Sequence, residues 1–205
     1  MNSLLLTQLV VAKVCHDLAT PLNSLSLGLE MAGDGESFSA DTYDLLMQSA
    51  GVMKSRLKFF RSLFSSGSGT PTFPEVCDIL KECAQHNKVS FSLIAPNLIE
   101  APAGVPARLI LALAFMGLEG LPRGGKLTIS IDPENNIISQ SDGDLAQLRP
   151  GYEDILTGVD ASLESQTSRS IFPYFAKMLA QECNKQIHTS SQPGFFEIKA
   201  IGKNL

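Results

Sequence analysis

No part of this sequence holds the roughly 18 consecutive apolar residues that a membrane-spanning helix needs, so we expect no membrane span. The N-terminus lacks a basic start and is soon interrupted by polar residues, which argues against a signal peptide. The four cysteines form no CxxC pair, so neither a zinc site nor a disulfide framework is indicated. Together these absences predict a cytoplasmic protein with reduced thiols and no metal ion of its own.

Positive charge is also scarce. The 205 residues include 16 Lys and Arg against 21 Asp and Glu, which gives a formal net charge of -5. This balance argues against wholesale binding to nucleic acid, although it leaves room for a local basic patch. The hydrophobic fraction of 44% and the charged fraction of 18% are typical of a globular protein. The length allows one large domain or two small ones.

Residues 3–32 are predicted to form one helix that continues through Pro21. At about 100° per residue, a set of apolar side chains falls within one narrow stripe of this helix. This stripe of helix one consists of Val11, Val14, Leu18, Leu22, Leu25 and Leu29. We expect it to face the core.

A second helix is predicted after the turn Gly33-Asp34-Gly35, with Ser39 as its N-cap. Its apolar residues recur at alternating spacings of four and three, which is the pattern of a coiled-coil seam. The seam of helix two consists of Leu46, Ala50, Met53, Leu57, Phe60 and Phe64. Two such helices expose more apolar surface than one hairpin can bury, so we predict a homodimer in which two hairpins form a four-helix bundle.

The pattern changes after the Ser- and Gly-rich stretch 65–71. We therefore expect a helical hairpin in residues 1–65, a linker in 66–73 and a second domain in 74–205. In the second domain we expect helices at 73–85, 108–121 and about 168–183, and strands at 89–94, 126–131, 137–140, 186–190 and 195–201. The predicted fold class is α + α/β, a helical hairpin followed by one sheet covered by helices.

The run from Val14 to Asn23 carries the clearest chemical signal. His16 is followed by an acid, Asp17, and lies about 150° around the helix from the stripe of helix one, so it should point away from the core. Neutral imidazole has a lone pair that can attack a phosphoryl group, and an adjacent carboxylate can hold the proton of the other ring nitrogen. The alternative for an isolated His-Asp pair is an ordinary solvated surface pair.

His16-Asp17 followed by Thr20-Pro21-Leu22 resembles the phospho-acceptor box of two-component histidine kinases. The segment 118–129 resembles the end of the kinase nucleotide-binding helix and the strand after it. Kinases carry an asparagine on that helix to hold Mg²⁺, whereas the matching position here is Met116, and a thioether is a poor ligand for a hard cation. The glycine motifs for adenine and phosphate are replaced by Ser141-Asp142-Gly143-Asp144-Leu145 and by residues 168–174.

A kinase-like chain that keeps the histidine box and loses these ATP motifs resembles the ChpT-type histidine phosphotransferases of alphaproteobacteria. The resemblance implies a dimer that relays a phosphoryl group from the receiver domain of a hybrid histidine kinase to the receiver domains of response regulators. It implies His16 as phospho-acceptor, Asp17 as orienting base, and Thr20 and Asn23 along the approach of the aspartyl phosphate. It also implies a phosphotransferase with no bound cofactor, the Mg²⁺ being carried by the partner receiver.

Lys54, Lys58 and Arg61 lie on one flank of helix two, with Arg56 on the other. The flank is either a solvated helix face or a docking surface that steers acidic receivers. Two other functions stay open at this level. A divergent ATP-dependent histidine kinase would have to bind nucleotide, whereas a non-catalytic kinase-like scaffold would have no need of His16 in its chemical context.

Overall fold

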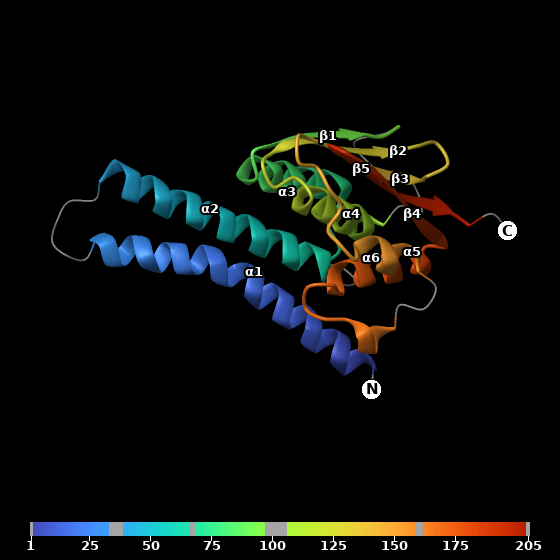
Figure 1. Ribbon diagram of the computed structural model, residues 1–205, viewed down its shortest axis with the longest axis horizontal. Helices are drawn as coiled ribbons and strands as arrows, with labels where there is room; N and C mark the ends of the chain where they lie inside the picture. Colours follow the sequence, from blue (N-terminus) through green and yellow to red (C-terminus); the bar gives the residue numbers. More distant parts are fainter. Residues whose placement is uncertain (1, 33–38, 66–68, 97–105, 159–161, 204–205) are drawn as a thin grey trace.

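The computed structural model describes residues 2–32, 39–65, 69–96, 106–158 and 162–203. Helices α1 (Asn2–Ala32) and α2 (Ala40–Leu63) form an antiparallel hairpin that projects from a compact α/β lobe (Figure 1). Both helices agree with the prediction, and the Ser39 hydroxyl caps α2 by accepting the backbone N–H of Thr42 at 3.1 Å. The predicted turn at residues 33–35 lies outside the described residues. None of the described helices, α1 included, is long and apolar enough to cross a membrane.

The lobe is a two-layer α/β sandwich, which confirms the predicted fold class. Its five-stranded sheet has the order β1-β2-β3-β5-β4, in which only the β1–β2 pair is parallel. The strands are β1 (Val89–Ile94), β2 (Gly125–Ile131), β3 (Ile137–Asp142), β4 (Lys185–Gln192) and β5 (Phe195–Gly202). The helices are α3 (Phe73–His86), α4 (Ala107–Glu119), α5 (Tyr152–Thr157) and α6 (Ile171–Glu182), with a short 3₁₀ helix, η2 (Leu163–Ser165).

Alternation along the strands explains why the helices cover one face of the sheet. In β2, Leu127, Ile129 and Ile131 are buried, while the residues between them are only partly so. This period of two turns one apolar row toward α4, which is buried on most of its surface. The two short elements α5 and η2 were not predicted, because three to six residues are too few to show a helical period. Helix α6 begins three residues later than predicted.

The hairpin and the lobe share one hydrophobic core. Phe59 of α2 is 1% exposed and stacks on Phe115 of α4 with ring centroids 4.8 Å apart. Phe60 and Phe64 stack on Phe172 of α6 at 5.9 and 6.2 Å. Burying each such ring stabilises the fold by about 1.5–3 kcal/mol. The last two positions of the predicted seam of helix two therefore pack inside the chain, and the expectation that they complete a dimer seam is wrong.

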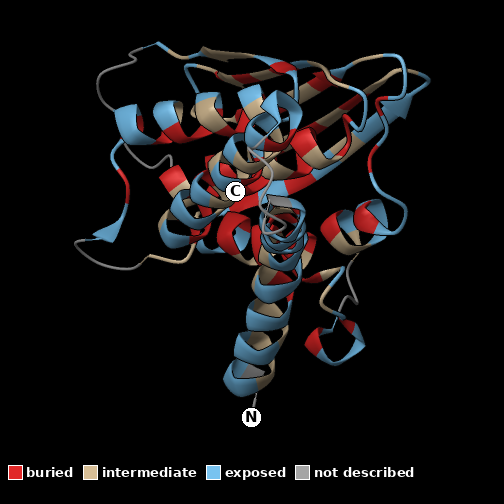
Figure 2. Cartoon of the chain, turned by 90° about the vertical axis from the view of Figure 1, so that its left-hand side faces the viewer, coloured by how far each residue is buried: buried red, intermediate tan, exposed pale blue. Residues whose placement is uncertain are grey.

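The stripe of helix one also lies differently from the prediction. The face of α1 turned inward carries the buried Lys13, Asp17 and Pro21, whereas Leu22 and Leu29 of the stripe are 50% and 58% exposed. Within one chain, the expectation that this stripe faces the core is only partly met: Val14 and Leu18 pack against the core, whereas Val11, Leu22 and Leu29 do not. Figure 2, in which the hairpin points toward the viewer, shows the buried residues gathered in the lobe behind it. The hairpin thus presents an uncovered apolar surface.

Candidate phosphotransfer site

His16 lies on the outer face of α1, with 71% of its side chain exposed, as the helical period predicted. Its Nδ1 is 3.1 Å from Oδ1 of Asp17. An ionised carboxylate can only accept a hydrogen bond, so this contact selects the tautomer that carries the proton on Nδ1. No hydrogen bond from the described part of the chain engages Nε2. The arrangement leaves the lone pair of Nε2 free to attack an electrophile.

Pro21, inside α1, creates a contact between the two helices of the hairpin near His16. A proline has no N–H, so the carbonyl oxygen four residues earlier, that of Asp17, loses its helical donor. The guanidinium of Arg56 on α2 supplies that donor, with Nη1 donating to the Asp17 carbonyl. Figure 1 shows that α1 bends along its length, as helices with an internal proline do. The Thr-Pro step thus fixes α2 against the turn of α1 that carries the histidine.

A buried charge network lies behind Asp17. Lys13, only 6% exposed at its side chain, places Nζ 2.9 Å from the Asp17 carboxylate and 3.3 Å from Oε1 of Glu119 on α4. Glu119 also pairs with Arg149 at 3.3 Å and accepts the hydroxyl hydrogen of Tyr152 at 2.9 Å. Burial, followed by the Glu119 carboxylate, raises the pKa of Tyr152, so this hydroxyl stays a donor. The network joins the hairpin to the lobe through paired charges.

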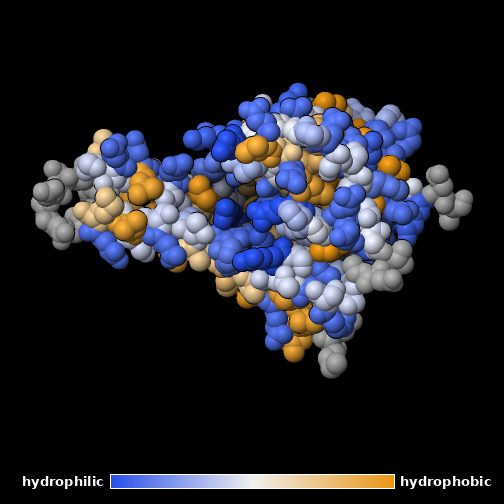
Figure 3. Space-filling model, in the orientation of Figure 1, coloured by the Kyte–Doolittle hydropathy of each residue, from blue (hydrophilic) through white to orange (hydrophobic). Residues whose placement is uncertain are grey.

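A cleft of about 810 Å³ opens beside His16, between the hairpin and the lobe. Two carboxylates line it, those of Asp17 and Glu119. Five cations line it: Lys13, Arg56, Lys88, Arg123 and Arg149. A net basic cleft in a chain of net charge -5 attracts anionic groups to the neighbourhood of the histidine. Figure 3 shows strongly hydrophilic side chains gathered where the projecting hairpin meets the lobe.

Two glycine positions shape this cleft. A Cβ on Gly51 of α2 would lie 2.7 Å from Cε1 of His86, so a larger residue there would displace the imidazole that lines this cleft. Gly124 has a φ of +82°, and a Cβ there would lie 2.6 Å from the Lys88 carbonyl oxygen. The Pro-Arg-Gly-Gly segment therefore turns tightly enough to bring Arg123 to the rim.

The residues singled out from the sequence are only partly brought together. Thr20 lines the cleft, while Asn23 is exposed one turn further along α1 and does not line it. Lys54, Lys58 and Arg61 also lie outside the cleft lining. Lys58 pairs with Glu82 of α3 at 3.2 Å.

Lys13, Arg56 and Glu119 were missed as site residues. Lys13 carried a local signal, because a lysine four residues before an aspartate pairs with it on a helix. The contact between Lys13 and Glu119 spans 106 residues and had no such signal.

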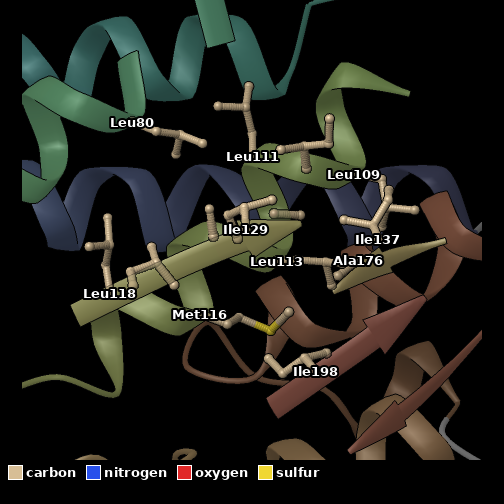
Figure 4. Close-up of a cluster of buried hydrophobic side chains, with 14 of the residues drawn as sticks. Leu80, Leu109, Leu111, Leu113, Met116, Leu118, Ile129, Ile137, Ala176 and Ile198 are labelled. Atoms are coloured by element: carbon tan, nitrogen blue, oxygen red, sulfur yellow. The ribbon is translucent and has the colours of Figure 1, made fainter. Parts of the chain in front are cut away.

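The positions that hold Mg²⁺ and phosphate in a kinase do not fit those groups here. Met116 is 1% exposed and lies beside Ile198 in the core (Figure 4), and its thioether offers a hard cation no oxygen ligand. At the place of the glycine-rich loop, residues 167–170 form a turn closed by hydrogen bonds between Thr167 and Ser170. The next residues enter α6, and Phe172 fills the core.

Cys83, which lines the cleft wall, makes stability depend on pH. Burial, and then the Glu82 carboxylate, raise the pKa of this thiol to about 12. Below the ordinary thiol pKa of about 8.5 both states hold the proton; above it only the unfolded chain ionises, so stability is lost as pH rises. We expect denaturant titrations between pH 9 and 11 to show a loss of roughly 1.4 kcal/mol per pH unit from this group. Cys83→Ser should lose less over the same range, and parallel curves for the two proteins would contradict the assignment.

Comparison with known proteins agrees with this fold and cleft. A family model described as the histidine phosphotransferase C-terminal domain matches residues 73–194, more than half of the chain. The chain is thus a protein phosphotransferase. It belongs to the histidine phosphotransferase family, and the ChpT-type resemblance of the sequence is confirmed.

Two individual proteins are similar over nearly their whole length. The protein phosphotransferase ChpT of Brucella abortus (strain 2308) is 24% identical over 193 residues, which cover 91% of this chain and 90% of that protein. A solved structure of a bacterial phosphotransferase superposes with a TM-score of 0.82 at 22% identity and covers 95% of both chains. The second likeness shows that the fold extends across hairpin and lobe together.

Proposed function

We propose that this chain is a relay protein that carries a phosphoryl group on Nε2 of His16. The group would come from the aspartyl phosphate of a hybrid kinase's receiver domain and pass to the receivers of response regulators. The observation that carries this proposal is the exposed imidazole whose Nδ1 is engaged by Asp17 while Nε2 is left free. Membership of the histidine phosphotransferase family supports the same chemistry.

In the transfer step, Nε2 attacks the phosphorus of the acyl phosphate. The N–P bond forms as the bond between phosphorus and the aspartyl oxygen breaks, which returns that aspartate to a carboxylate. The ring gains positive charge, and Asp17 stabilises it through the proton that stays on Nδ1. Thr20 in the cleft and Asn23, exposed one turn further along α1, would flank the approach, and Mg²⁺ held by the receiver would stabilise the transferring group from its side. Transfer onward to a regulator is the reverse of this step.

The basic cleft supports a docking role for the surface around His16. A receiver that carries acidic groups around its aspartate would be attracted by the five cations of the cleft, which raises the association rate. Lys54, Lys58 and Arg61 lie on α2 outside the cleft lining, where Lys58 pairs with Glu82 of α3, and we propose that they steer the receiver during its approach.

The proposal is tested by mixing the purified protein with a panel of radiolabelled, phosphorylated receiver domains. We expect label to pass from at least one receiver to this chain as an acid-labile, base-stable phosphate, the stability pattern of phosphohistidine. A chain that takes no label from any receiver of a hybrid kinase, while those receivers label a known phosphotransfer protein, would refute the relay.

We further propose that the chain does not bind ATP and is not an autonomous kinase. The buried Met116 and the closed turn at residues 167–170 support this, because neither leaves room for Mg²⁺ or a triphosphate. We expect isothermal titration with Mg²⁺-ATP at millimolar concentration to give no binding heat above dilution. A dissociation constant in the micromolar range, which corresponds to about -8 kcal/mol, would contradict this expectation and favour a kinase.

The uncovered surface of the hairpin supports a homodimer. Apolar side chains at least half exposed follow both helices: Leu4, Val11, Leu22 and Leu29 on α1, and Met47 and Leu57 on α2. Figure 3 shows hydrophobic side chains on the projecting hairpin. Exposed apolar patches of this kind mark association surfaces, and two hairpins packed as a four-helix bundle would cover them.

A further inference from the structure

A carboxylate of the lobe, that of Glu119, lies behind Lys13, the lysine that pairs with Asp17. Glu119, at the end of α4, contacts Lys13, and Lys13 contacts both oxygens of Asp17 at 2.9 Å. Lys13 cannot easily move away from this position, because its side chain is 6% exposed and Nζ lies 5.2 Å from the ring centre of Phe172. An unbroken line of contacts therefore runs from the lobe through the buried ammonium to His16.

The charges along this line determine how well Asp17 can hold the histidine. If the Lys13 ammonium were paired with Asp17 alone, it would compete with the Nδ1–H of His16 for the negatively charged oxygens of the Asp17 carboxylate. Glu119, on the other side of the ammonium, offsets that pull. Arg149 on the far side of Glu119 is 47% exposed, so solvent screens its effect. The buried part of the line, Asp17, Lys13 and Glu119, thus keeps one net negative charge.

We infer that Glu119 is a positioning residue for His16: through Lys13, it keeps Asp17 oriented and negatively charged so that the Nδ1–H tautomer prevails. The role resembles that of carboxylates behind the histidine ligands of metals, which fix the tautomer of a ring they do not touch. The lobe would then act on the histidine indirectly, from the end of α4 through Lys13 and Asp17. The inference rests on the proposed function only in taking His16 as the acceptor.

The test is a tautomer measurement by two-bond ¹H–¹⁵N spectroscopy of the His16 ring, with and without Glu119→Gln. Glutamine has the same shape and its amide oxygen can still accept from Tyr152, so packing is preserved. We expect the Nδ1–H population to fall. We also expect phosphorylation by phosphoramidate, a small donor that needs no docking and loses ammonia as its P–N bond breaks, to slow by roughly tenfold. An unchanged tautomer population in this variant would overturn the inference.

Two further variants separate positioning from a general loss of stability. Glu82→Gln makes the same charge change on α3, where Glu82 pairs with Lys58 and not with Lys13, and it should behave as wild type. Arg149→Gln removes the ion pair between Arg149 and Glu119, so Glu119 should interact more strongly with Lys13. The Nδ1–H population of His16 should therefore stay at or above the wild-type value. If the Nδ1–H population fell in Arg149→Gln as much as in Glu119→Gln, any disturbance of the charges around Lys13 would have this effect. That result would also overturn the inference.

The tautomer is read in the free protein without any donor, so its result is independent of the relay. A wild-type protein with the expected tautomer that takes no phosphoryl group from any receiver would refute the proposed function while supporting the positioning role. A wild-type His16 that is mainly in the Nε2–H form would refute the positioning role whether or not the relay operates.

Discussion

His16→Gln is expected to abolish phosphoryl acceptance while the fold stays intact. The amide of glutamine offers no ring nitrogen with a free lone pair, so no N–P bond can form. The side chain of His16 is 71% exposed, and its one hydrogen bond within the described part of the chain is with Asp17, so the substitution should change the free energy of unfolding by no more than about 0.5 kcal/mol. Transfer from a labelled receiver, measured beside a thermal unfolding curve, tests both parts.

The other two histidines serve as matched controls. His188→Gln changes an exposed residue of β4 and should accept phosphate as the wild type does. His86→Gln changes the second histidine of the cleft, which lies against Gly51. Acid-labile phosphate that persists on His16→Gln and disappears in His86→Gln would move the acceptor to His86 and reject the present assignment.

Leu22→Asp combined with Leu29→Asp is expected to convert a dimer into a folded monomer. A symmetric interface would contain both leucines of each protomer, and each buried leucine contributes about 1.5–3 kcal/mol. Because these leucines are already about half buried in the single chain, loss of the four side chains should weaken the dimer by about 3–6 kcal/mol, which is at least about a hundredfold in dissociation constant. Both residues are at least half exposed in the single chain, so the core of hairpin and lobe should remain. Sedimentation velocity over a concentration series measures the change.

Leu145→Asp is the matched control for this experiment. Leu145 is also 50% exposed but lies in the lobe, between β3 and α5, so the same apolar-to-acidic change should leave the dimer unaffected. The dimer proposal fails if the wild-type protein sediments as a folded monomer at tens of micromolar, or if both variants dissociate equally.

Most of the secondary structure and the acceptor box could be predicted from the sequence because they depend on local patterns. The period of apolar residues located the long helices, and the alternation along β2 and β5 located buried strands. The outward direction of His16 followed from its angle on α1, and the resemblance of its flanking residues to a phospho-acceptor box indicated the chemistry. Met116 argued against nucleotide binding at the level of the sequence, because a thioether is a poor Mg²⁺ ligand in any fold.

What surrounds the acceptor was decided only by the tertiary structure. The apolar pattern of α1 and α2 could not reveal which positions pack within the chain, because contacts within the hairpin, with the lobe and across a dimer all produce the same helical period. Phe60 and Phe64 pack against Phe172 of the lobe. Arg56 reaches the Asp17 carbonyl across 39 residues, and Glu119 reaches Lys13 across 106. Contacts at such separations arise from the packing of α2 and α4 against α1, and no local spacing in the sequence records them.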